Sequence, residues 1–460
     1  MHSNPHDLAT RLKGLLRGNA YPVLRWNEDG EETILSAAAL WNLALERRHQ
    51  WRRLGFRAGD FVRSEARGIE FVIDLVACGI GHHILWPRPM ELLDQGSVHM
   101  IGDSGAKPSV FLPASQSRAW EARTGQPISS PNVKGELANP ILLLQTSGTS
   151  GHGPKSVVLS AEAILYQIDS HLEVLRPASE STRLCILPWH HAFGLVLDLL
   201  LGLFAKQDLV IYGTLRKPPS FARVRETIQR DRPEWLALVP RQLDFLLSRP
   251  LSEYQALNIH VGGGLVGEKT LEHARGHFRN LIEGYGMTEC GPGILLDGRV
   301  LPGTVIRTNA DSELEVHSPS IGFWDERAHQ LTSDHFLKTG DLCEIESVSG
   351  EIRILGRTGN RLKLRDGTWT ARELVESEIE RGFGIQHAII VHKSEGAEVL
   401  LLTDGPLREP QEIKMRIVEF LEKRLGGMAR VQTRVIDAAL REIAEHRSGK
   451  TFKEALQGVL

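Results

Sequence analysis

The chain has 460 residues and a formal net charge of −3, so it is long enough for two or more domains and lacks the basic field typical of nucleic-acid-binding proteins. Hydrophobic residues make up 41% and charged residues 24%, a balance typical of soluble globular proteins. These values predict a soluble protein with a large hydrophobic core and no nucleic-acid partner.

Cysteine usage and the opening stretch indicate a cytoplasmic protein. The cysteines form no C-x-x-C pair and predict no disulfide framework, which fits the reducing cytosol; they are Cys78, Cys185, Cys290 and Cys343. The stretch MHSNPHDLATRLKGLL lacks the apolar core of a signal peptide. The most apolar run, 195–204, is too short to span a bilayer and contains Asp198, so no stable membrane insertion is expected. No histidine spacing is typical of metal ligands, so no structural metal is expected.

Segments of helical period alternate with short apolar strands through most of the chain. In the first part, this pattern predicts a helix over 37–54, a strand over 60–64, a helix over 69–79, and strands over 141–144 and 157–159. Ser160 is expected to cap a helix that begins near Ala161. Further strands, each followed by a helix-like segment, are predicted over 184–187, 235–239 and 258–261. This alternation predicts an α/β domain with a mostly parallel sheet and with sites at the strand ends.

The pattern changes in the last third of the chain. From about 302 to 354, short strands with Gly, Asp and Ser turns predict a small β region. Beyond Gly356-Arg357, the pattern predicts a compact α+β part with strands over 362–364, 387–392 and 399–402 and helices over 371–381 and 410–425. We therefore predict an N-terminal domain over 1–356 and a small C-terminal domain over 357–460.

The stretch QTSGTSGHGPKS, residues 145–156, combines glycines, hydroxyl side chains and a lysine, as loops that contact phosphate do. Gly148, Gly153 and Lys155 match the spacing of a nucleotide-binding P-loop. Two features weigh against a P-loop: Pro154 has no N–H for the phosphate cradle, and the residues after Lys155 are strand-like, whereas a P-loop lysine begins a helix. A plain linker is another alternative, but it does not explain the lysine or the apolar strands on both sides.

Four further stretches follow in order, and a lysine comes after them. They are LPWHHAFG (187–194), EGYGMTECGP (283–292), LKTGDL (337–342), GRTGNRLK (356–363) and the terminal HRSGK (446–450). With the loop at 145–156 and LGFRAGD (54–60), they resemble the motifs of the adenylate-forming superfamily of acyl-CoA synthetases, peptide-synthetase adenylation domains and luciferases. The resemblance runs from about residue 35 to 453. It implies the adenylation fold, with a large α/β N-terminal domain of parallel sheets flanked by helices, a small β-barrel-like region, and a small mobile α+β C-terminal domain.

In that superfamily a carboxylate attacks the α-phosphate of ATP and expels pyrophosphate. Two anions must meet, so the site needs positive charge and hydrogen-bond donors. By resemblance, the loop at 145–156 closes over the β- and γ-phosphates, and Lys155 adds charge or braces the loop. The loop residues assigned to ATP are Thr146, Ser147, Gly148, Thr149, Ser150 and Gly151.

The resemblance assigns adenine to two segments that follow strands. Gly263 and Gly264 lack a Cβ and could line one face of the base, while Tyr285, next to Gly286, stacks on it with its flat ring.

The phosphate and ribose contacts are assigned in the same way. Thr288 donates to the α-phosphate, and Glu289 holds Mg²⁺, a hard cation suited to carboxylate and phosphate oxygens. Asp341 accepts the ribose hydroxyls and Arg357 donates to the same ribose. Outside this context, an Asp after Thr-Gly is more often a turn residue, and the stretch around Thr288 is an ordinary strand-to-turn segment.

The LPWHHAFG stretch is expected to border the acid tunnel. His191, with Trp189 and Phe193, faces the carboxylate by resemblance, and His190 is the weaker choice by register. A core or surface histidine is the alternative reading. The apolar surroundings favour an aliphatic or aryl acid, and no aspartate stands in the stretch to pair the α-ammonium of an amino acid.

The C-terminal part is expected to serve both halves of the reaction. Lys450 would bridge the carboxylate and the α-phosphate as charge develops, although an exposed terminal lysine is otherwise a solvated charge. Gly359 stands at the hinge position, and Lys363 is assigned to the thiol half-reaction.

The chain also departs from the family pattern. The loop carries one extra residue at His152-Gly153, Gly359 stands where Asp or Lys is usual, and Asp366-Gly367-Thr368 replaces Gly-x-Arg. These differences favour a specialised ligase, for example one that loads a carrier protein in a biosynthetic cluster.

The resulting prediction is a cytoplasmic, AMP-forming acid–thiol ligase. It would use ATP and Mg²⁺ to make an acyl-adenylate from a carboxylic acid and then a thioester on CoA or on the phosphopantetheine of an acyl carrier protein. One alternative is hydroxybenzoate-type aryl-acid activation with carrier loading. Alternatives of other classes are a non-catalytic regulator or scaffold that binds nucleotide or acyl-adenylate, and an oxidative, luciferase-like enzyme.

Overall fold

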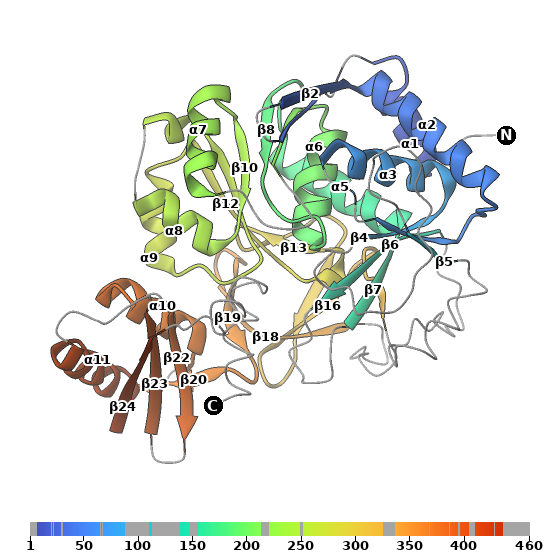
Figure 1. Cartoon of the computed structure of the whole chain (residues 1–460). Coiled ribbons are helices and arrows are strands. Elements are labelled where there is room, and N and C mark those ends of the chain that lie inside the picture. The colour runs from blue at the N-terminus through green and yellow to red at the C-terminus, as the bar shows by residue number, and fades with distance from the viewer. Residues whose placement is uncertain are drawn as a thin grey trace. The chain divides into compact units, whose positions relative to one another are not determined.

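The computed structural model resolves two compact units, shown in Figure 1. Unit 1 comprises residues 1–263, 272–306 and 316–337, and unit 2 comprises 264–271, 307–315 and 338–460. Within them the structure describes residues 7–19, 21, 23–28, 31–64, 66, 68–87, 110–112, 139–146, 155–212, 220–248, 252–324, 336–367, 369–385, 387–393, 396–403, 410–426 and 428–435. None of the helices in these ranges combines the length and the hydrophobicity of a transmembrane span.

The predicted domain boundary falls inside unit 2. Residues 338–356 cluster with the C-terminal part, whereas the sequence pattern places them in the N-terminal domain. The division into 1–356 and 357–460 therefore stays a prediction.

A large, mostly parallel sheet forms the first layer of unit 1. Among the described residues it has nine strands, in the order β14 (Arg299–Val300), β13 (Gly293–Leu296), β12 (Asn280–Gly286), β11 (Asn258–Val261), β10 (Trp235–Leu238), β8 (Thr182–Cys185), β9 (Asp208–Ile211), β1 (Val23–Glu28) and β2 (Glu31–Ser36). Pairing is parallel from β12 to β1 and antiparallel at both ends. The central strands are buried along their whole length, as expected for a parallel sheet covered on both faces. The predicted α/β fold is confirmed.

A second sheet carries the strands that flank the predicted phosphate loop. Its order in the described part of the chain is β17 (Phe323–Trp324), β7 (Lys155–Ser160), β6 (Pro140–Thr146), β4 (Ile84–Pro87), β3 (Phe61–Ser64) and β5 (Val110–Leu112). Helix α5 (Ala161–Leu175) begins directly after β7, and the hydroxyl of Ser160 accepts the N–H of Ala163 at 3.0 Å. The predicted cap at Ser160 is confirmed, because this hydroxyl satisfies one of the free N–H groups of the first turn.

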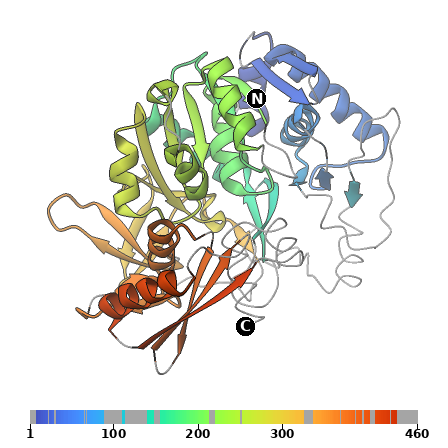
Figure 2. The same cartoon turned by 60° about the vertical axis from the view of Figure 1, so that its left-hand side comes forward.

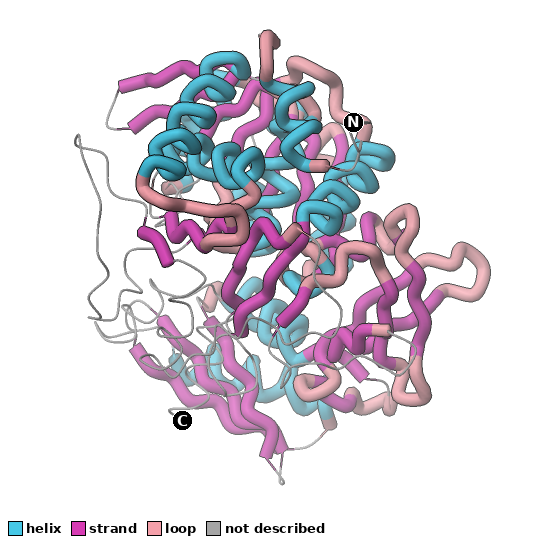
Figure 3. The backbone as a smooth tube through the Cα atoms, turned by 90° about the vertical axis from the view of Figure 1, so that its right-hand side faces the viewer, coloured by secondary structure: helices cyan, strands magenta, loops and turns pink. Residues whose placement is uncertain are grey.

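Helices lie between the two sheets of unit 1. Helix α3 (Gly68–Gly81) contacts β1 in one sheet and β3 and β4 in the other, which explains why almost every residue of this helix is buried. Helix α5 contacts β6, β7 and the π-helix η2 (Phe193–Leu200), and η2 packs on β8 and β10. Figure 3 shows the helices of unit 1 packed over its strands. Among the described residues before 280, the remaining helices are α1 (Leu8–Leu16), α2 (Ala37–Arg53), α6 (Leu201–Phe204), α7 (Phe221–Asp231), α8 (Pro240–Ser248), η3 (Ser252–Ala256) and α9 (Glu268–Arg275).

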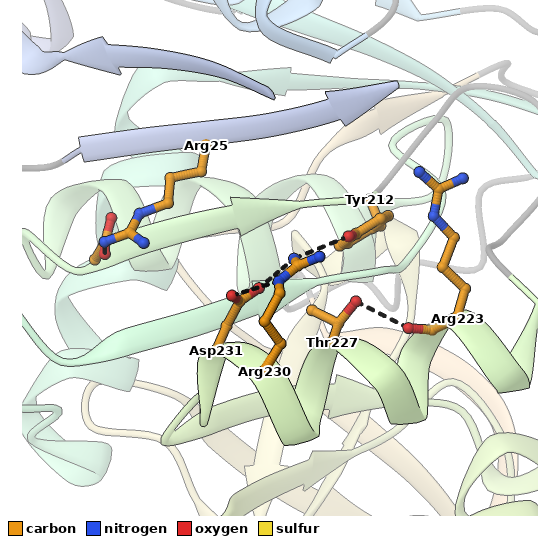
Figure 4. A network of polar contacts seen from close by, with 7 residues as sticks. Arg25, Tyr212, Arg223, Thr227, Arg230 and Asp231 are labelled. Carbon is orange, nitrogen blue, oxygen red and sulfur yellow. Dashed lines mark hydrogen bonds and ion pairs between the residues drawn. The ribbon is translucent and has the colours of Figure 1, made fainter. Parts of the chain in front are cut away.

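Polar contacts tie α7 and β1 to strand β9 (Figure 4). Arg230 of α7 donates to the hydroxyl of Tyr212, just after β9, at 3.2 Å and pairs with Asp231 at 2.6 Å. At the start of β9, Arg25 of β1 pairs with Asp208 at 2.5 Å. These contacts hold the strands at this end of the large sheet in place.

Unit 2 contains the small β region and the C-terminal α+β part. Among the described residues, one sheet, most of which belongs to unit 2, runs β15 (Val305–Thr308), β16 (Glu313–His317), β18 (Leu337–Ile345) and β19 (Ile352–Arg357). A hairpin joins β20 (Arg361–Lys363) to β21 (Trp369–Ala371). A further sheet of β22 (His387–Lys393), β23 (Gly396–Thr403) and β24 (Met428–Val435) lies beside α10 (Arg372–Phe383) and α11 (Pro410–Leu425), as Figure 2 shows. Val375 and Ile379 of α10 share a buried cluster with Ile390, Val399 and Ile417. The predicted strands and helices of this part are confirmed.

All four cysteines lie in described segments and are free, buried thiols. They sit in α3, β8, the short turn η4 (Thr288–Cys290) and β18, and burial raises the pKa of each; they are Cys78, Cys185, Cys290 and Cys343. A raised pKa keeps a thiol protonated and unreactive.

Candidate active site

The predicted phosphate loop connects two paired strands. Thr146, the last residue of β6, pairs across the hairpin with Lys155, the first residue of β7. A P-loop lysine begins a helix, whereas Lys155 begins a strand, so the P-loop alternative is wrong. Residues 147–151, assigned to the β- and γ-phosphates, lie outside the described residues, and their role stays a prediction.

The carboxyl end of β11 meets the segment after β8 through Phe193. A Cβ at Gly262 would stand 3.3 Å from the ring of Phe193 and 3.1 Å from the carbonyl oxygen of Gly284, so only glycine fits this approach without a shift. Gly263 follows with a φ of 78°, which also favours glycine. The predicted acid-pocket residue Phe193 and the predicted adenine-binding glycine therefore lie side by side.

Strand β12 carries Tyr285 toward the turn that holds Thr288 and Glu289. A Cβ at Gly286 would lie 1.8 Å from the carbonyl oxygen of Pro292, so glycine is required where the chain returns into β13. The turn η4 then places Thr288 and Glu289 next to each other, and both are partly exposed. A hydroxyl and a single carboxylate at a strand end fit Mg²⁺ that arrives with phosphate oxygens, since Mg²⁺ binds few protein carboxylates and keeps other oxygen ligands.

The histidine pair of the PWHHAF stretch lies at the start of η2. The rings of His190 and His191 are 4.1 Å apart between centroids. Burial, with a smaller contribution from His191, lowers the pKa of His190 to about 3. Desolvation by the surrounding protein lowers the pKa of His191 as well, although part of its side chain is exposed to solvent. Both imidazoles are therefore neutral at pH 7, and His191 is free to serve as a neutral hydrogen-bonding group.

Trp189, also predicted for the acid pocket, is part of the hydrophobic core. The indole is fully buried and stacks on Phe71 with ring centroids 5.0 Å apart. Its assignment to the wall of the acid tunnel stays a prediction.

Two further histidines, which the sequence analysis did not identify, are buried near Phe193. His260 is fully buried on β11, makes an edge contact with the Phe193 ring at 5.0 Å, and approaches Gly284, where a Cβ would stand 2.5 Å from its Nε2. His171 of α5 lies 6.0 Å from His260 between ring centroids, and its Nδ1 donates to the carbonyl oxygen of Gln167 at 2.7 Å. Burial lowers the pKa of His171 to about 4 and that of His260 well below its usual range.

These buried imidazoles predict a loss of stability in acid. His171 titrates near its usual value of 6.5 when unfolded and at about 4 when folded, so between these values the unfolded chain binds a proton that the folded chain does not. The free energy of unfolding should therefore fall as the pH drops from 6.5 to 4. His171→Leu should reduce the difference between pH 7 and pH 4.5 by about 2–3 kcal/mol, measured by urea unfolding. The exposed His49 provides the control in His49→Gln; equal pH dependence in wild type and His171→Leu would contradict the assignment.

The two predicted ribose ligands in unit 2 lie together. Asp341 of β18 is opposite Arg357 of β19 in the strand register, and Arg357 Nε is 2.9 Å from Asp341 Oδ1. Gly340, before the aspartate, has a φ of 75° and donates its N–H to Glu313 at 2.9 Å. The Asp341 N–H is held by the Thr339 hydroxyl at 3.1 Å. The backbone of this strand thus holds a carboxylate beside a guanidinium, and their assignment to the ribose stays a prediction.

The other predicted residues of unit 2 lie on exposed turns or strand ends. Gly359 occupies an exposed turn between β19 and β20, with open space where a Cβ would stand. Lys363 ends β20 and is exposed, and Gly264 begins the first segment of the unit. Lys450 lies outside the described residues. The hinge, thiol and catalytic roles of Gly359, Lys363 and Lys450 stay predictions.

A buried ion pair connects η2 to strand β8. Arg183 of β8 and Asp198 of η2 are both fully buried, with Arg183 Nη1 3.5 Å from Asp198 Oδ1. The Arg183 Nε donates to Gln207 at 2.7 Å, and its guanidinium lies over the Trp235 ring at 5.3 Å. Burial raises the pKa of Asp198 to about 6 despite this partner. A signal for the pair was present in the sequence, because an Asp inside the apolar run 195–204 needs a buried partner.

Known proteins resemble the chain in sequence. Residues 88–323, just over half of the chain, match the family of AMP-binding enzymes. The 4-coumarate–CoA ligase-like 2 of Arabidopsis thaliana is 26% identical over 259 residues, which cover 48% of this chain and 44% of that protein. The indoleacetate–CoA ligase of Aromatoleum aromaticum is 24% identical over 233 residues, which cover 44% of this chain and 45% of that protein. The match thus spans less than half the length of these two relatives.

The fold resembles that of solved enzymes over nearly its whole length. The o-succinylbenzoate CoA synthetase of Bacillus subtilis, solved with its acyl-adenylate intermediate, superposes with a TM-score of 0.72 at 18% identity, covering 93% of this chain and 94% of the solved chain. The architecture is the predicted adenylation fold. With the family match over more than half of its residues, the chain belongs to the AMP-binding enzyme family.

Proposed function

We propose that this protein uses ATP to activate a carboxylic acid as an acyl-adenylate and then transfers the acyl group to a thiol. The observation that carries the proposal is the approach of the Phe193 ring to Gly262 and Gly263 at the carboxyl end of β11. This contact joins the predicted acid pocket to the predicted adenine site, as a reaction between an acid and a nucleotide requires. The names of the CoA ligases among the relatives support the same reaction.

The first half-reaction joins the acid to AMP. One carboxylate oxygen forms a bond to the α-phosphorus, and the bond from that phosphorus to the pyrophosphate oxygen breaks. In this proposal Thr288 donates to the α-phosphate and the neutral His191 orients the carboxylate without adding charge. Glu289 would hold Mg²⁺, which when bound neutralises phosphate charge. Asp341 and Arg357 bind the ribose.

The second half-reaction passes the acyl group to sulfur. The thiol sulfur attacks the acyl carbon, the bond from that carbon to the AMP oxygen breaks, and the thiol proton is released. Gly359 would permit the rotation between the two steps, and Lys363 would face the acceptor. CoA is the acceptor to test first; the phosphopantetheine of a carrier protein is the second, favoured by the departures at Asp366-Gly367-Thr368.

The substrate is proposed to be an apolar acid, with aryl acids first. Phe193 offers a flat apolar wall, and aryl acids appear in the names of the coumarate and indoleacetate ligases. The four buried thiols support the proposal that the enzyme works in a reducing cytoplasm.

The test is acid-dependent exchange of labelled pyrophosphate into ATP across a panel of benzoic, arylacetic, arylpropenoic and aliphatic acids. Exchange with one acid class supports the proposal and identifies the substrate; mass spectrometry then detects the thioester with CoA or with a carrier protein. ATP binding without exchange for any acid contradicts the proposal and favours the nucleotide-binding regulator. Light or O₂ uptake would indicate the luciferase-like alternative.

A further inference from the structure

Gln167 is a buried side chain of α5 whose amide is fully engaged by a distant part of the chain. Its Oε1 accepts the N–H of Gly293 at 2.8 Å. Its Nε2 lies 3.0 Å from the carbonyl oxygen of Cys290, 2.9 Å from that of Gly293 and 2.8 Å from the hydroxyl of Ser320. The N–H and carbonyl groups around the amide also fix which end is oxygen and which is nitrogen, because only one orientation satisfies them.

The backbone groups that Gln167 binds lie at the end of the turn that carries Thr288 and Glu289 and at the start of the strand that follows it. Cys290 is the last residue of that turn, and Gly293 begins the strand that returns from it. The amide therefore fixes the backbone on the side where the chain leaves the turn. Since the side chain is fully buried, these bonds form in a low-dielectric environment, and leaving their partners unpaired is costly.

A chain of hydroxyl groups extends the same contact. The hydroxyls of Tyr166, Thr304, Ser318 and Ser320 follow one another at 2.8, 3.1 and 2.9 Å, and the last also donates to the carbonyl oxygen of Cys290 at 2.7 Å. Tyr166 is the neighbour of Gln167 on α5. Helix α5 is thus connected to the turn by hydrogen bonds from two adjacent residues, Tyr166 and Gln167.

The start of α5 connects these hydrogen bonds to the strand that follows the predicted phosphate loop. Strand β7 begins at Lys155, and its last residue, Ser160, caps α5, so fewer than two helical turns separate the cap from Gln167. One continuous strand–helix segment therefore joins the end of the loop to the turn with Thr288 and Glu289.

We propose that Gln167 is a positioning residue that sets the Thr288–Glu289 turn for the α-phosphate and its metal ion. The inference rests on the proposed function. Gln167 touches no reacting atom, and its effect would come from the place of the turn, where a shift of about 1 Å costs on the order of 10² in rate.

The test compares Gln167→Met with Asn258→Leu. Methionine keeps the length of glutamine and removes its hydrogen bonds. Asn258 is a matched control, because it is also a buried amide with two hydrogen bonds, to Glu234 at 2.8 Å and from Asn280 at 2.7 Å, but it lies at the opposite, amino ends of β11 and β12. Both variants are expected to lose stability. Only Gln167→Met should lower kcat for pyrophosphate exchange, by about 10- to 100-fold, and weaken the response to Mg²⁺, with little change in KM for the acid.

A second readout does not depend on activity. Cys290 lies in the turn, so the rate at which a thiol reagent labels it, relative to Cys185 in the core, measures local opening. Gln167→Met should raise this ratio, and Asn258→Leu should leave it unchanged. Equal ratios, or equal losses of kcat in the two variants, would overturn the inference while wild-type exchange upholds the proposed function. If the wild type exchanges no pyrophosphate, the proposed function fails, and the labelling ratio alone decides whether Gln167 holds the turn.

Discussion

Alanine in place of Lys450 is expected to lower acid-dependent pyrophosphate exchange by about 10²–10³, the effect of removing one donor to a developing charge. Lys450 is proposed to bridge the carboxylate and the α-phosphate as the new bond forms. A contact made only in the transition state affects kcat and leaves ground-state binding of ATP nearly unchanged. Exchange kinetics and equilibrium ATP binding, measured on the same preparation, separate the two.

Lys453 provides the matched control for this experiment. It lies three residues further on in the same terminal stretch, so Lys453→Ala removes an equal charge without removing the proposed bridge. Supplying a synthetic acyl-adenylate bypasses the first step, and thioester formation by Lys450→Ala should then approach that of the wild type. Equal exchange by Lys450→Ala and wild type would remove Lys450 from the mechanism.

Breaking the buried pair between Arg183 and Asp198 is expected to have the largest effect on stability. Arg183→Met leaves the Asp198 carboxylate fully buried without its cation, which costs about 3–5 kcal/mol of the free energy of unfolding. The double variant Arg183→Met with Asp198→Leu removes both charges and should recover most of that loss. Urea unfolding of the two single variants and the double variant gives the coupling between them.

Two further measurements test this prediction: the pH dependence of the stability loss in Arg183→Met, and the stability loss when an exposed ion pair is broken. Burial favours the protonated form of Asp198, so the penalty in Arg183→Met should be smaller at pH 5 than at pH 8. Arg353 and Glu344 form an exposed pair at 2.8 Å, and Arg353→Met should cost less than about 1 kcal/mol. If Arg183→Met and Arg353→Met lower the free energy of unfolding by similar amounts, the prediction that the buried pair matters more for stability is wrong.

Local patterns predicted the fold well where a cap or a periodic segment is strong. Helix α5 begins at Ala161 after the Ser160 cap, and α11 covers Pro410–Leu425, as the sequence indicated. The strand predicted over 184–187 instead forms over Thr182–Cys185, because its ends depend on neighbours β9 and β10. The pair β1 and β2 was not predicted, because its partner β9 lies far away in the sequence.

The candidate site shows the same division between local and distant information. Motif resemblance named Asp341 and Arg357 for one ligand, and the structure places them in contact. It did not identify Gln167 or His260, whose partners lie on other strands and helices. Such contacts between sequence-distant residues arise only when the elements pack, so no local pattern reports them.

The residues proposed for acid and nucleotide follow different strands of one sheet. Phe193 lies after β8, whereas Thr288 and Glu289 lie after β12, and the strands between them pair in parallel. The two sets of residues therefore belong to separate segments of the sequence, so a substitution in one segment leaves the residues of the other unchanged. Under the proposed function, selection for a new acid would act on the segment after β8, and selection for the nucleotide would act on the turn after β12.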